Sequence, residues 1–364
     1  PREGVVLLDG VCWSCLAIHH LHTSRTEHRA STPDIMKTIK LNNGSQMPIV
    51  GLGTWQATDE EVETAINTAL EAGYRHIDTA YVYMNEAPIG RALKKWLDSG
   101  KVKREELFIV TKLPNFGNHP DRVEKYIKRS LAALQLDYLD LYLVHHPCGL
   151  VEREGDMLPR DESGALLVDK ETDIISVWKA MEKLVDAGLT RAIGLSNFNS
   201  NQIKRITDSA RIVPANLQVE LHVYFQQREL VAFCHALDIS VCAYAPIGSP
   251  GLQSFVKMIG DDPDMIPKLS PLTEPVVCKM AEKYNKTPAQ VLLRHIIQRD
   301  IAVIPKSANP QRIKQNIDIF DFELSNEEME ELNALDKGHK GRLFGEHMLK
   351  GINEHPEYPY RAPY

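Results

Sequence analysis

Long apolar runs, cysteine and an excess of basic charge are all scarce in this chain of 364 residues. No stretch approaches the roughly 18 consecutive apolar residues that cross a bilayer, so we expect no membrane-spanning segment. The six cysteines show no framework spacing, which is typical of a reducing compartment and predicts a cytoplasmic protein. With 42 basic and 49 acidic side chains, the net charge of −7 provides no electrostatic footprint for nucleic acid or an anionic membrane.

The remaining composition is that of a globular protein, with 43% hydrophobic and 25% charged residues. The length allows two domains of about 150 residues each, or one α/β barrel of about 250 residues or more. The order of the predicted elements has to decide between them.

The first 35 residues differ from the rest of the chain. They hold a Cys-x-x-Cys motif beginning at Cys12, followed by four histidines, in no helical or strand period. A zinc site is one interpretation, but no second ligand pair follows at a standard spacing. The other is an extension or a translated leader ahead of Met36, disordered because it has no core of its own. We therefore expect an extension over residues 1–35 and a single barrel domain over residues 36–364.

Strand-like and helix-like segments alternate after this extension. A turn at Asn42–Ser45, between two short apolar segments, predicts an N-terminal β-hairpin. Amphipathic segments separate the later strand candidates, which predicts an α/β fold, a (β/α)8 TIM barrel. A doubly wound Rossmann sheet is the alternative, but Gly51-Leu52-Gly53 follows a hairpin strand and lacks the third glycine. The strand candidates are His76–Asp78, Leu107–Lys112, Leu139–His145, Ala192–Asn197, Leu217–Glu220, Ser240–Tyr244, Ala302–Ile304 and, more weakly, Ile317–Ile319.

Ionisable residues end three successive strand candidates. These residues are Asp78, Lys112 and His145, and Tyr83 follows on the loop after the first of the three strands. Each one alone has a structural interpretation, as a cap, a snorkelling lysine or a hydrogen-bonded core histidine. Functional residues of barrels lie at the C-terminal ends of the strands, so we expect all four to converge on one cavity.

Such a cavity suits proton donation to a developing alkoxide. A neighbouring ammonium, here Lys112, lowers the pKa of a tyrosine from its usual value of about 10. Asp78 is available to neutralise the buried lysine, and a neutral His145 can orient a carbonyl oxygen. The set therefore suits hydride addition to a carbonyl, with the hydride supplied by a cofactor. No metal is required, and the barrel offers no Cys/His cluster to hold one.

The cofactor signal follows the seventh strand candidate. Lys306 and Arg312 bracket a predicted helix start, where Ser307 or Asn309 can cap and Pro310 fits the first helical position. Two cations at one helix start can bind a terminal phosphate, such as the 2′-phosphate of NADPH. The alternative is an ordinary helix start with solvated charges.

Four segments together resemble the aldo-keto reductase superfamily, in its aldose reductase and aldehyde reductase branch, from about residue 37 to the C-terminus. These segments are Gly51–Trp55, Gly73–Ala80, Gly194–Asn199 and Ile304–Ser307. The resemblance implies an enzyme, an NADPH-dependent oxidoreductase that reduces aldehydes and ketones to alcohols.

The family's catalytic tetrad falls on four matching residues of this chain. The resemblance implies that Tyr83 is the general acid, supported by Lys112 and Asp78, and that His145 positions the carbonyl. In the related steroid double-bond reductases a glutamate stands at the histidine position, so His145 favours carbonyl reduction.

The resemblance also implies a set of cofactor contacts. Tyr244 would stack on the nicotinamide ring, and Lys306 with Arg312 would hold the adenosine end. The expected cofactor-binding residues are Gly53, Thr54, Trp55, Asp78, Ser196, Asn197, Gln218, Tyr244, Ser249, Lys306, Ser307, Asn309, Arg312, Gln315 and Asn316.

The substrate pocket departs from the family pattern. The expected pocket residues are Trp55, Pro114, His146, Leu150 and Leu158, of which all but Trp55 stand where relatives carry aromatic residues. A wider pocket for bulkier carbonyl substrates is one hypothesis, and refilling of the space by Phe255 is the other. A C-terminal substrate loop, at Leu343–Ile352, would form the lid.

Two other functions remain open at this point. Fold alone never guarantees activity, so an NADPH-binding structural or regulatory barrel with little turnover is the alternative. An isomerase or aldolase with Lys112 as a Schiff-base nucleophile would leave Tyr83 unexplained. We expect a monomer whose partner is a small-molecule aldehyde or ketone.

Overall fold

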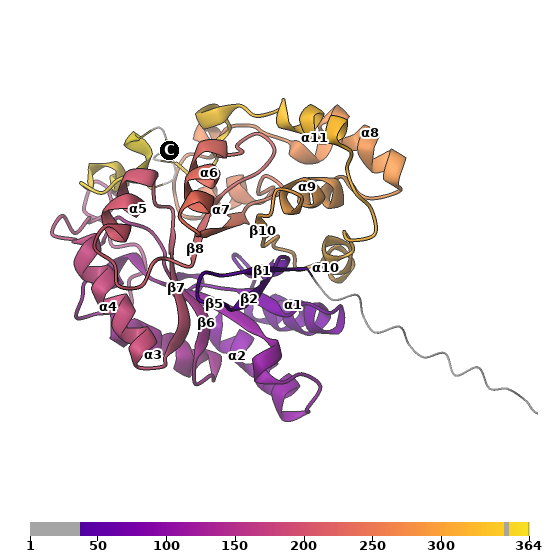
Figure 1. Ribbon diagram of the computed structural model, residues 1–364. Helices are drawn as coiled ribbons and strands as arrows, with labels where there is room; N and C mark the ends of the chain where they lie inside the picture. Colours follow the sequence, from indigo (N-terminus) through magenta and orange to yellow (C-terminus); the bar gives the residue numbers. More distant parts are fainter. Residues whose placement is uncertain (1–36, 346–348, 363) are drawn as a thin grey trace, which may run out of the picture. The chain divides into compact units, whose positions relative to one another are not determined.

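An eight-stranded parallel sheet forms the centre of the structure, a computed structural model that describes residues 37–345, 349–362 and 364 (Figure 1). The predicted extension and its Cys-x-x-Cys motif lie outside the described residues. Along the sheet the strand order is β10-β9-β8-β7-β6-β5-β4-β3, so each strand lies beside its neighbour in the sequence. The strands are β3 (Gly51–Gly53), β4 (His76–Asp78), β5 (Phe108–Leu113), β6 (Leu139–Val144), β7 (Thr190–Ser196), β8 (Asn216–Glu220), β9 (Ser240–Tyr244) and β10 (Ala302–Val303).

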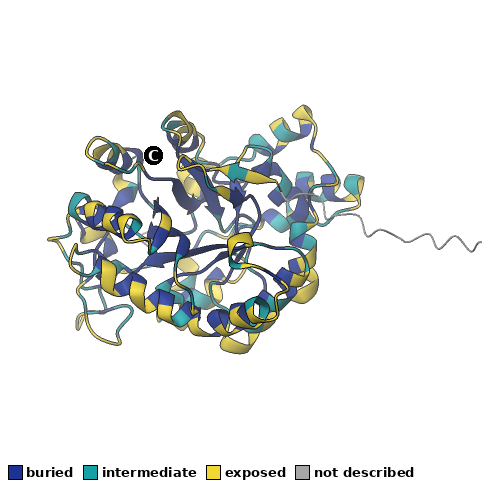
Figure 2. Cartoon of the chain, turned by 60° about the horizontal axis from the view of Figure 1, so that its bottom comes forward, coloured by how far each residue is buried: buried dark blue, intermediate teal, exposed yellow. Residues whose placement is uncertain are grey.

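The two edges of this sheet meet and close the barrel. Val50 pairs with Val303 and Gly53 pairs with Lys306 in parallel bridges. The backbone N–H of Gly53 donates to the carbonyl oxygen of Pro305 at 3.2 Å. The strands are almost entirely buried, while the surrounding helices carry their exposed residues on the outward side (Figure 2). The predicted (β/α)8 barrel is therefore confirmed.

The predicted eighth strand is wrong. Ile317 ends helix α10 (Pro310–Ile317), which starts from an Asn309 cap with proline at its first position. The eighth strand is instead the Gly51-Leu52-Gly53 segment, whose two glycines have low strand propensity. The structure needs both glycines, because a Cβ on Gly51 would lie 2.7 Å from the ring of His76, and one on Gly53 would lie 2.6 Å from a backbone oxygen. Close approach of neighbouring backbones, which propensity does not report, makes this segment a strand.

Helices connect the successive strands and surround the barrel. Capping residues determine where the helices begin. Helix α1 (Asp59–Glu71) starts after a capping box formed by Thr58 and Glu61, and helix α4 (Ile174–Asp186) starts after the N-cap residue Asp173. Helix α10 packs against α1, so the helices also close into a ring. None of the helices in the described part of the chain is long and apolar enough to cross a membrane. Besides α10, the α-helices of the described residues are α1 (Asp59–Glu71), α2 (Glu86–Asp98), α3 (Val123–Leu134), α4 (Ile174–Asp186), α5 (Ser200–Thr207), α6 (Arg228–Ala236), α7 (Leu252–Met258), α8 (Pro275–Tyr284), α9 (Pro288–Ile297) and α11 (Asn326–Asn333).

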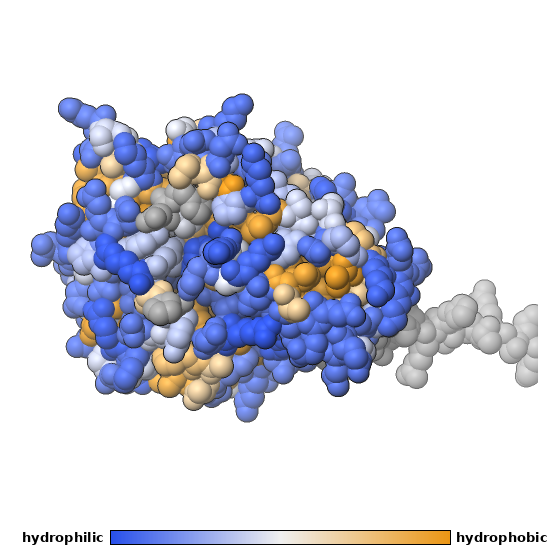
Figure 3. Space-filling view, turned by 90° about the horizontal axis from the view of Figure 1, so that it is seen from above, coloured by the Kyte–Doolittle hydropathy of each residue, from blue (hydrophilic) through white to orange (hydrophobic). Residues whose placement is uncertain are grey.

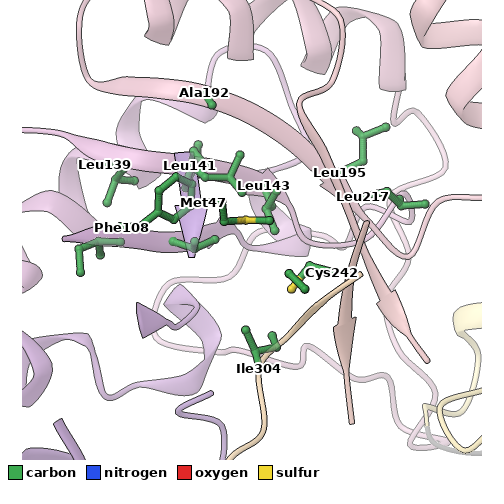
Figure 4. Packing of buried hydrophobic residues seen from close by; sticks show 14 of the residues in the cluster. Met47, Phe108, Leu139, Leu141, Leu143, Ala192, Leu195, Leu217, Cys242 and Ile304 are labelled. Carbon is green, nitrogen blue, oxygen red and sulfur yellow. The ribbon is translucent and has the colours of Figure 1, made fainter. Parts of the chain in front are cut away.

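The predicted N-terminal hairpin lies at the end of the barrel where the strands begin. It consists of β1 (Thr38–Lys40) and β2 (Gln46–Pro48). Its turn donates side-chain hydrogen bonds to the carbonyl oxygens of Pro214 and Arg191, next to the starts of β8 and β7. Met47 is fully buried, and Figure 4 shows it among the apolar side chains of the barrel strands. Because the hairpin covers this end of the barrel, the functional residues are expected at the opposite end, where the strands terminate.

Candidate active site

A buried ion pair joins the ends of β4 and β5. Lys112 Nζ lies 2.6 Å from Asp78 Oδ1, and both side chains are at most 2% exposed. The same ammonium donates to the carbonyl oxygen of Thr79 at 2.8 Å. The other carboxylate oxygen of Asp78 accepts a hydrogen bond from Gln218 Nε2 at 2.7 Å. The pair is therefore held from three strands, as a buried charge pair requires.

Tyr83 and His145 lie against this pair. Tyr83 ends a 3₁₀ turn (Tyr81–Tyr83) on the loop after β4, and His145 directly follows β6. Lys112 Nζ lies 5.2 Å from the centroid of the Tyr83 ring. The rings of Tyr83 and His145 are 5.8 Å apart at their centroids, with an interplanar angle of 76°. The structure thus brings the four predicted catalytic residues together.

Burial sets the protonation states of these groups. It lowers the pKa of His145 well below its usual value, and the Lys112 ammonium lowers it further, so the ring is neutral. Burial raises the pKa of Tyr83 even though Lys112 opposes this effect, so the hydroxyl keeps its proton. Burial alone would lower the pKa of Lys112, but Asp78 and Tyr83 together raise it above the usual value. The site therefore combines a protonated tyrosine, a neutral histidine and a charged lysine.

The residues expected at the nicotinamide lie at the ends of β7, β8 and β9. Asn197 has a left-handed backbone (φ +64°), and its Nδ2 donates to the carbonyl oxygen of His145 at 2.9 Å and to Ser196 Oγ at 3.2 Å. Tyr244 donates its hydroxyl proton to Asn197 Oδ1 at 2.8 Å. The backbone N–H of Asn197 donates to the carbonyl oxygen of Gln218 at 3.1 Å, and the side chain of Gln218 donates to Asp78. All four residues thus belong to one polar network with the lysine–aspartate pair.

The residues expected at the adenosine phosphate gather after β10. Asn309 caps helix α10 by accepting from the backbone N–H of Arg312 at 3.0 Å. Lys306 is half-buried, and its ammonium has one hydrogen-bond partner in the described chain, the carbonyl oxygen of Gln56 at 3.4 Å. Burial lowers the pKa of Lys306, the Glu61 carboxylate opposes this shift, and nearby Arg312 adds to it. No ion pair satisfies either cation among the described residues, so this helix start fits an anionic group.

The other expected cofactor residues differ in accessibility. Thr54 is buried and donates its hydroxyl proton to the carbonyl oxygen of Asp78 at 3.0 Å. Ser249 and Gln315 are half-buried, whereas Ser307 is buried just before the start of helix α10 and Asn316 is buried near its end. No group of three or more His, Cys, Asp and Glu side chains within the described ranges is arranged to hold a metal ion.

The expected substrate-pocket residues do not form one cluster. Trp55 packs against Phe255 of α7, with ring centroids 4.8 Å apart, and against Phe344 at 5.7 Å. His146 lies 6.3 Å from the ring of Tyr360, near the C-terminus. The other three residues are buried in or packed near the main core: Pro114, Leu150 and Leu158. Phe255 thus packs directly against Trp55.

Sequence reasoning missed two residues at the end of β8. Glu220 and His222 are fully buried, with His222 Nε2 3.0 Å from Glu220 Oε1. Gln218 and Glu220 occupy alternate positions of β8, and His222 follows two residues beyond its end. A period of two places Gln218 and Glu220 on one face of the strand, a signal that the sequence did contain.

A closed (β/α)8 barrel with a buried lysine–aspartate pair, a tyrosine and a histidine at its C-terminal end defines a class of barrel enzyme whose site donates protons. Comparison with known proteins is consistent with that class. A family model described as "Aldo/keto reductase family" matches residues 49–337. The chain belongs to this family of oxidoreductases, as its motifs predicted.

Individual relatives match over nearly their whole length. Aldo-keto reductase family 1 member A1 of Mus musculus is 46% identical over 333 residues, which cover 90% of this chain and 99% of that protein. The protein of the same name from Gallus gallus is 45% identical over 332 residues, or 90% of this chain and 98% of the relative. The solved structure of the aldose reductase from Schistosoma japonicum matches with a TM-score of 0.80 and 44% identity, over 90% of this chain and 100% of that one.

Proposed function

We propose that this protein reduces aldehydes and ketones to alcohols with NADPH, and that Tyr83 is the general acid. The observation that carries the proposal is the position of the Tyr83 ring, 5.2 Å from the Lys112 ammonium and 5.8 Å from the His145 ring, beside the buried pair of Lys112 and Asp78. When bound, the nicotinamide supplies a hydride to the carbonyl carbon. The relatives named above support the carbonyl as the reacting group.

Each residue of the tetrad then has a defined task. His145 binds the carbonyl oxygen and orients it toward Tyr83, and a neutral ring does this without adding charge. Tyr83 donates its proton to that oxygen as negative charge develops there. Lys112 stabilises the resulting phenolate, which is why a pKa raised by burial does not prevent donation. Asp78 keeps Lys112 charged and oriented through its contact of 2.6 Å.

The preference for NADPH rests on the start of helix α10. Lys306 and Arg312 carry two positive charges at a helix N-terminus whose dipole also favours an anion. A 2′-phosphate is the part of the cofactor that distinguishes NADPH from NADH. Asn197 and Gln218 hold the other end, where their amides can bind the carboxamide of the nicotinamide.

The test is the loss of reduced-nicotinamide absorbance with NADPH or with NADH. The substrate panel contains aldehydes, quinones, sugars and steroid ketones. We expect turnover with NADPH and much weaker turnover with NADH. Binding of NADPH without turnover of any substrate would favour the structural or regulatory alternative, and failure to bind NADPH would refute the cofactor assignment.

We also propose that the active protein is a cytoplasmic monomer with residues 36–364 as its catalytic domain. Size-exclusion chromatography with light scattering tests the monomer. Activity in a chain that starts at Met36, equal to that of the full chain, tests the domain assignment.

A further inference from the structure

One buried carboxylate near the site has no task in the mechanism above. Glu220 ends β8 and is 1% exposed. Its Oε1 accepts the backbone N–H of Leu343 at 2.7 Å, and its Oε2 accepts the backbone N–H of Phe344 at 2.9 Å. These donors are 123 and 124 residues away along the chain. His222 lies at the same carboxylate oxygen as Leu343.

The segment that carries Phe344 is docked on the loop after β8 by several further contacts. Gly341 lies so close to this loop that a Cβ there would meet the carbonyl oxygen of Tyr224 at 2.0 Å. The guanidinium of Arg342 lies 4.5 Å from the ring centroid of Phe225 and 3.8 Å from that of Tyr360. These contacts position residues 341 and 342, and the carboxylate of Glu220 then positions the next two backbone amides.

Phe344 is thereby placed where the substrate is expected. Its ring lies 5.7 Å from Trp55 and 5.2 Å from Tyr244, at an interplanar angle of 89° to the latter. Trp55 is the expected pocket residue, and Tyr244 is the expected partner of the nicotinamide. The face shown in Figure 3 is mostly hydrophilic, with separate smaller hydrophobic areas.

We propose that Glu220 is a specificity-determining positioning residue: its carboxylate holds Phe344 against Trp55 and so sets the width of the substrate pocket. This proposal rests on the proposed reduction of carbonyl substrates. Glu220 acts through Phe344 and touches no reacting atom. Release of Phe344 opens the pocket to bulky carbonyl substrates.

The chemistry of the carboxylate explains why a glutamate is needed. An ionised carboxylate accepts with both oxygens and donates nothing. A glutamine has one accepting oxygen, so one of the two backbone N–H groups would face an amide nitrogen that cannot accept. A buried donor left without an acceptor is unfavourable, so the segment would move.

The experiment compares Glu220→Gln, Phe344→Ala and the double variant in the full chain. The readout is the ratio of kcat/KM for 4-phenylbenzaldehyde to kcat/KM for propanal, with NADPH. Both single variants should raise this ratio about tenfold, which is a usual size for discrimination in an apolar pocket. The double variant should raise it no further, because both changes act through the same ring.

Glu182→Gln is the matched control. Glu182 on α4 is 6% exposed and accepts two backbone N–H groups with one oxygen, Oε1, from Arg211 at 2.7 Å and Ile212 at 2.8 Å. It resembles Glu220 in burial, but a glutamine at position 182 keeps the single oxygen that accepts both groups. Glu182→Gln therefore controls for the loss of a buried carboxylate and should leave the substrate ratio unchanged. Equal loss of activity toward both aldehydes in Glu220→Gln, or additive effects in the double variant, would overturn the proposal.

Hydrogen exchange supplies a readout that needs no turnover. The amides of Leu343 and Phe344 should exchange about tenfold faster in Glu220→Gln than in the wild type. One amide would lose its hydrogen-bond acceptor, and the other would donate to a weaker, uncharged acceptor. If the wild type reduces neither aldehyde, the proposed function fails, and the exchange rates still test Glu220. Unchanged exchange in Glu220→Gln would show that the carboxylate does not hold the segment.

Discussion

Replacing Asp78 with asparagine should destabilise the fold more than any surface charge change. The variant leaves the ammonium of Lys112, which is fully buried, without the carboxylate that lies 2.6 Å away. Loss of one partner from a buried pair costs about 3–5 kcal/mol, since the remaining charge is neither solvated nor neutralised. Urea unfolding followed by circular dichroism measures this as a lower midpoint at an unchanged slope.

The double variant Asp78→Asn/Lys112→Met tests the cause. It removes the stranded charge, so most of the lost free energy of unfolding should return even though the site is destroyed. Asp208→Asn is the control, because Asp208 pairs with Lys204 on the surface, where the two side chains are 60% and 65% exposed. That change should cost less than about 1 kcal/mol. A cost of Asp78→Asn as small as that of the control, or no recovery in the double variant, would show that the unpaired Lys112 charge does not cause the loss of stability.

Three further predictions concern the closing strand, a buried histidine and the phosphate site. Gly53→Ala should lower the free energy of unfolding, measured in urea, by about 1–3 kcal/mol, because the new Cβ would lie 2.6 Å from a backbone oxygen. Gly251→Ala, whose Cβ would first meet a side-chain atom at 3.2 Å, should lower it by less. An equal loss in the two variants would contradict the close approach at Gly53. Burial lowers the pKa of His295 to about 4, so the unfolded state, with a pKa of about 6.5, binds a proton that the native state does not. The free energy of unfolding should therefore fall as the pH drops from about 6.5 to 4, by about 1.4 kcal/mol per pH unit for this group. Urea titrations at several pH values should show a weaker pH dependence of this free energy in His295→Gln. An equally steep pH dependence in the variant would show that His295 does not cause it. Lys306→Met should raise KM for NADPH about tenfold and leave KM for NADH nearly unchanged. Lys314→Met, at an exposed position on the neighbouring helix α10, should change neither value. An equal rise for both cofactors would show that Lys306 does not bind the 2′-phosphate.

Local sequence signals predicted most of the barrel. Seven of the eight strand positions could be recognised because short apolar segments alternate with amphipathic ones. The eighth could not, because Gly51-Leu52-Gly53 becomes a strand through contacts with His76 and the backbone after β10, which no local pattern encodes. Residues 317–319 have the composition of a strand, but Ile317 is the last residue of helix α10, which begins after the N-cap residue Asn309.

The candidate site could be predicted in part for a related reason. Asp78, Lys112 and His145 stand at strand ends, and barrel geometry alone makes such positions converge. The direction of the net pKa shift at Tyr83 could not be read from the sequence, because the effect of burial outweighs that of the neighbouring ammonium. Contacts between distant segments, such as those of Glu220 with Phe344, require the folded chain.

The proposed mechanism depends on proton donation by the Tyr83 hydroxyl. Single-turnover reduction of an aldehyde by NADPH-saturated enzyme should be compared in wild type and in Tyr83→Phe, with NADPH affinity measured separately by fluorescence titration. We expect unchanged NADPH affinity and a rate lower by at least about 100-fold, the smallest contribution usual for a general acid. A Tyr83→Phe rate within a few-fold of the wild type would contradict this mechanism.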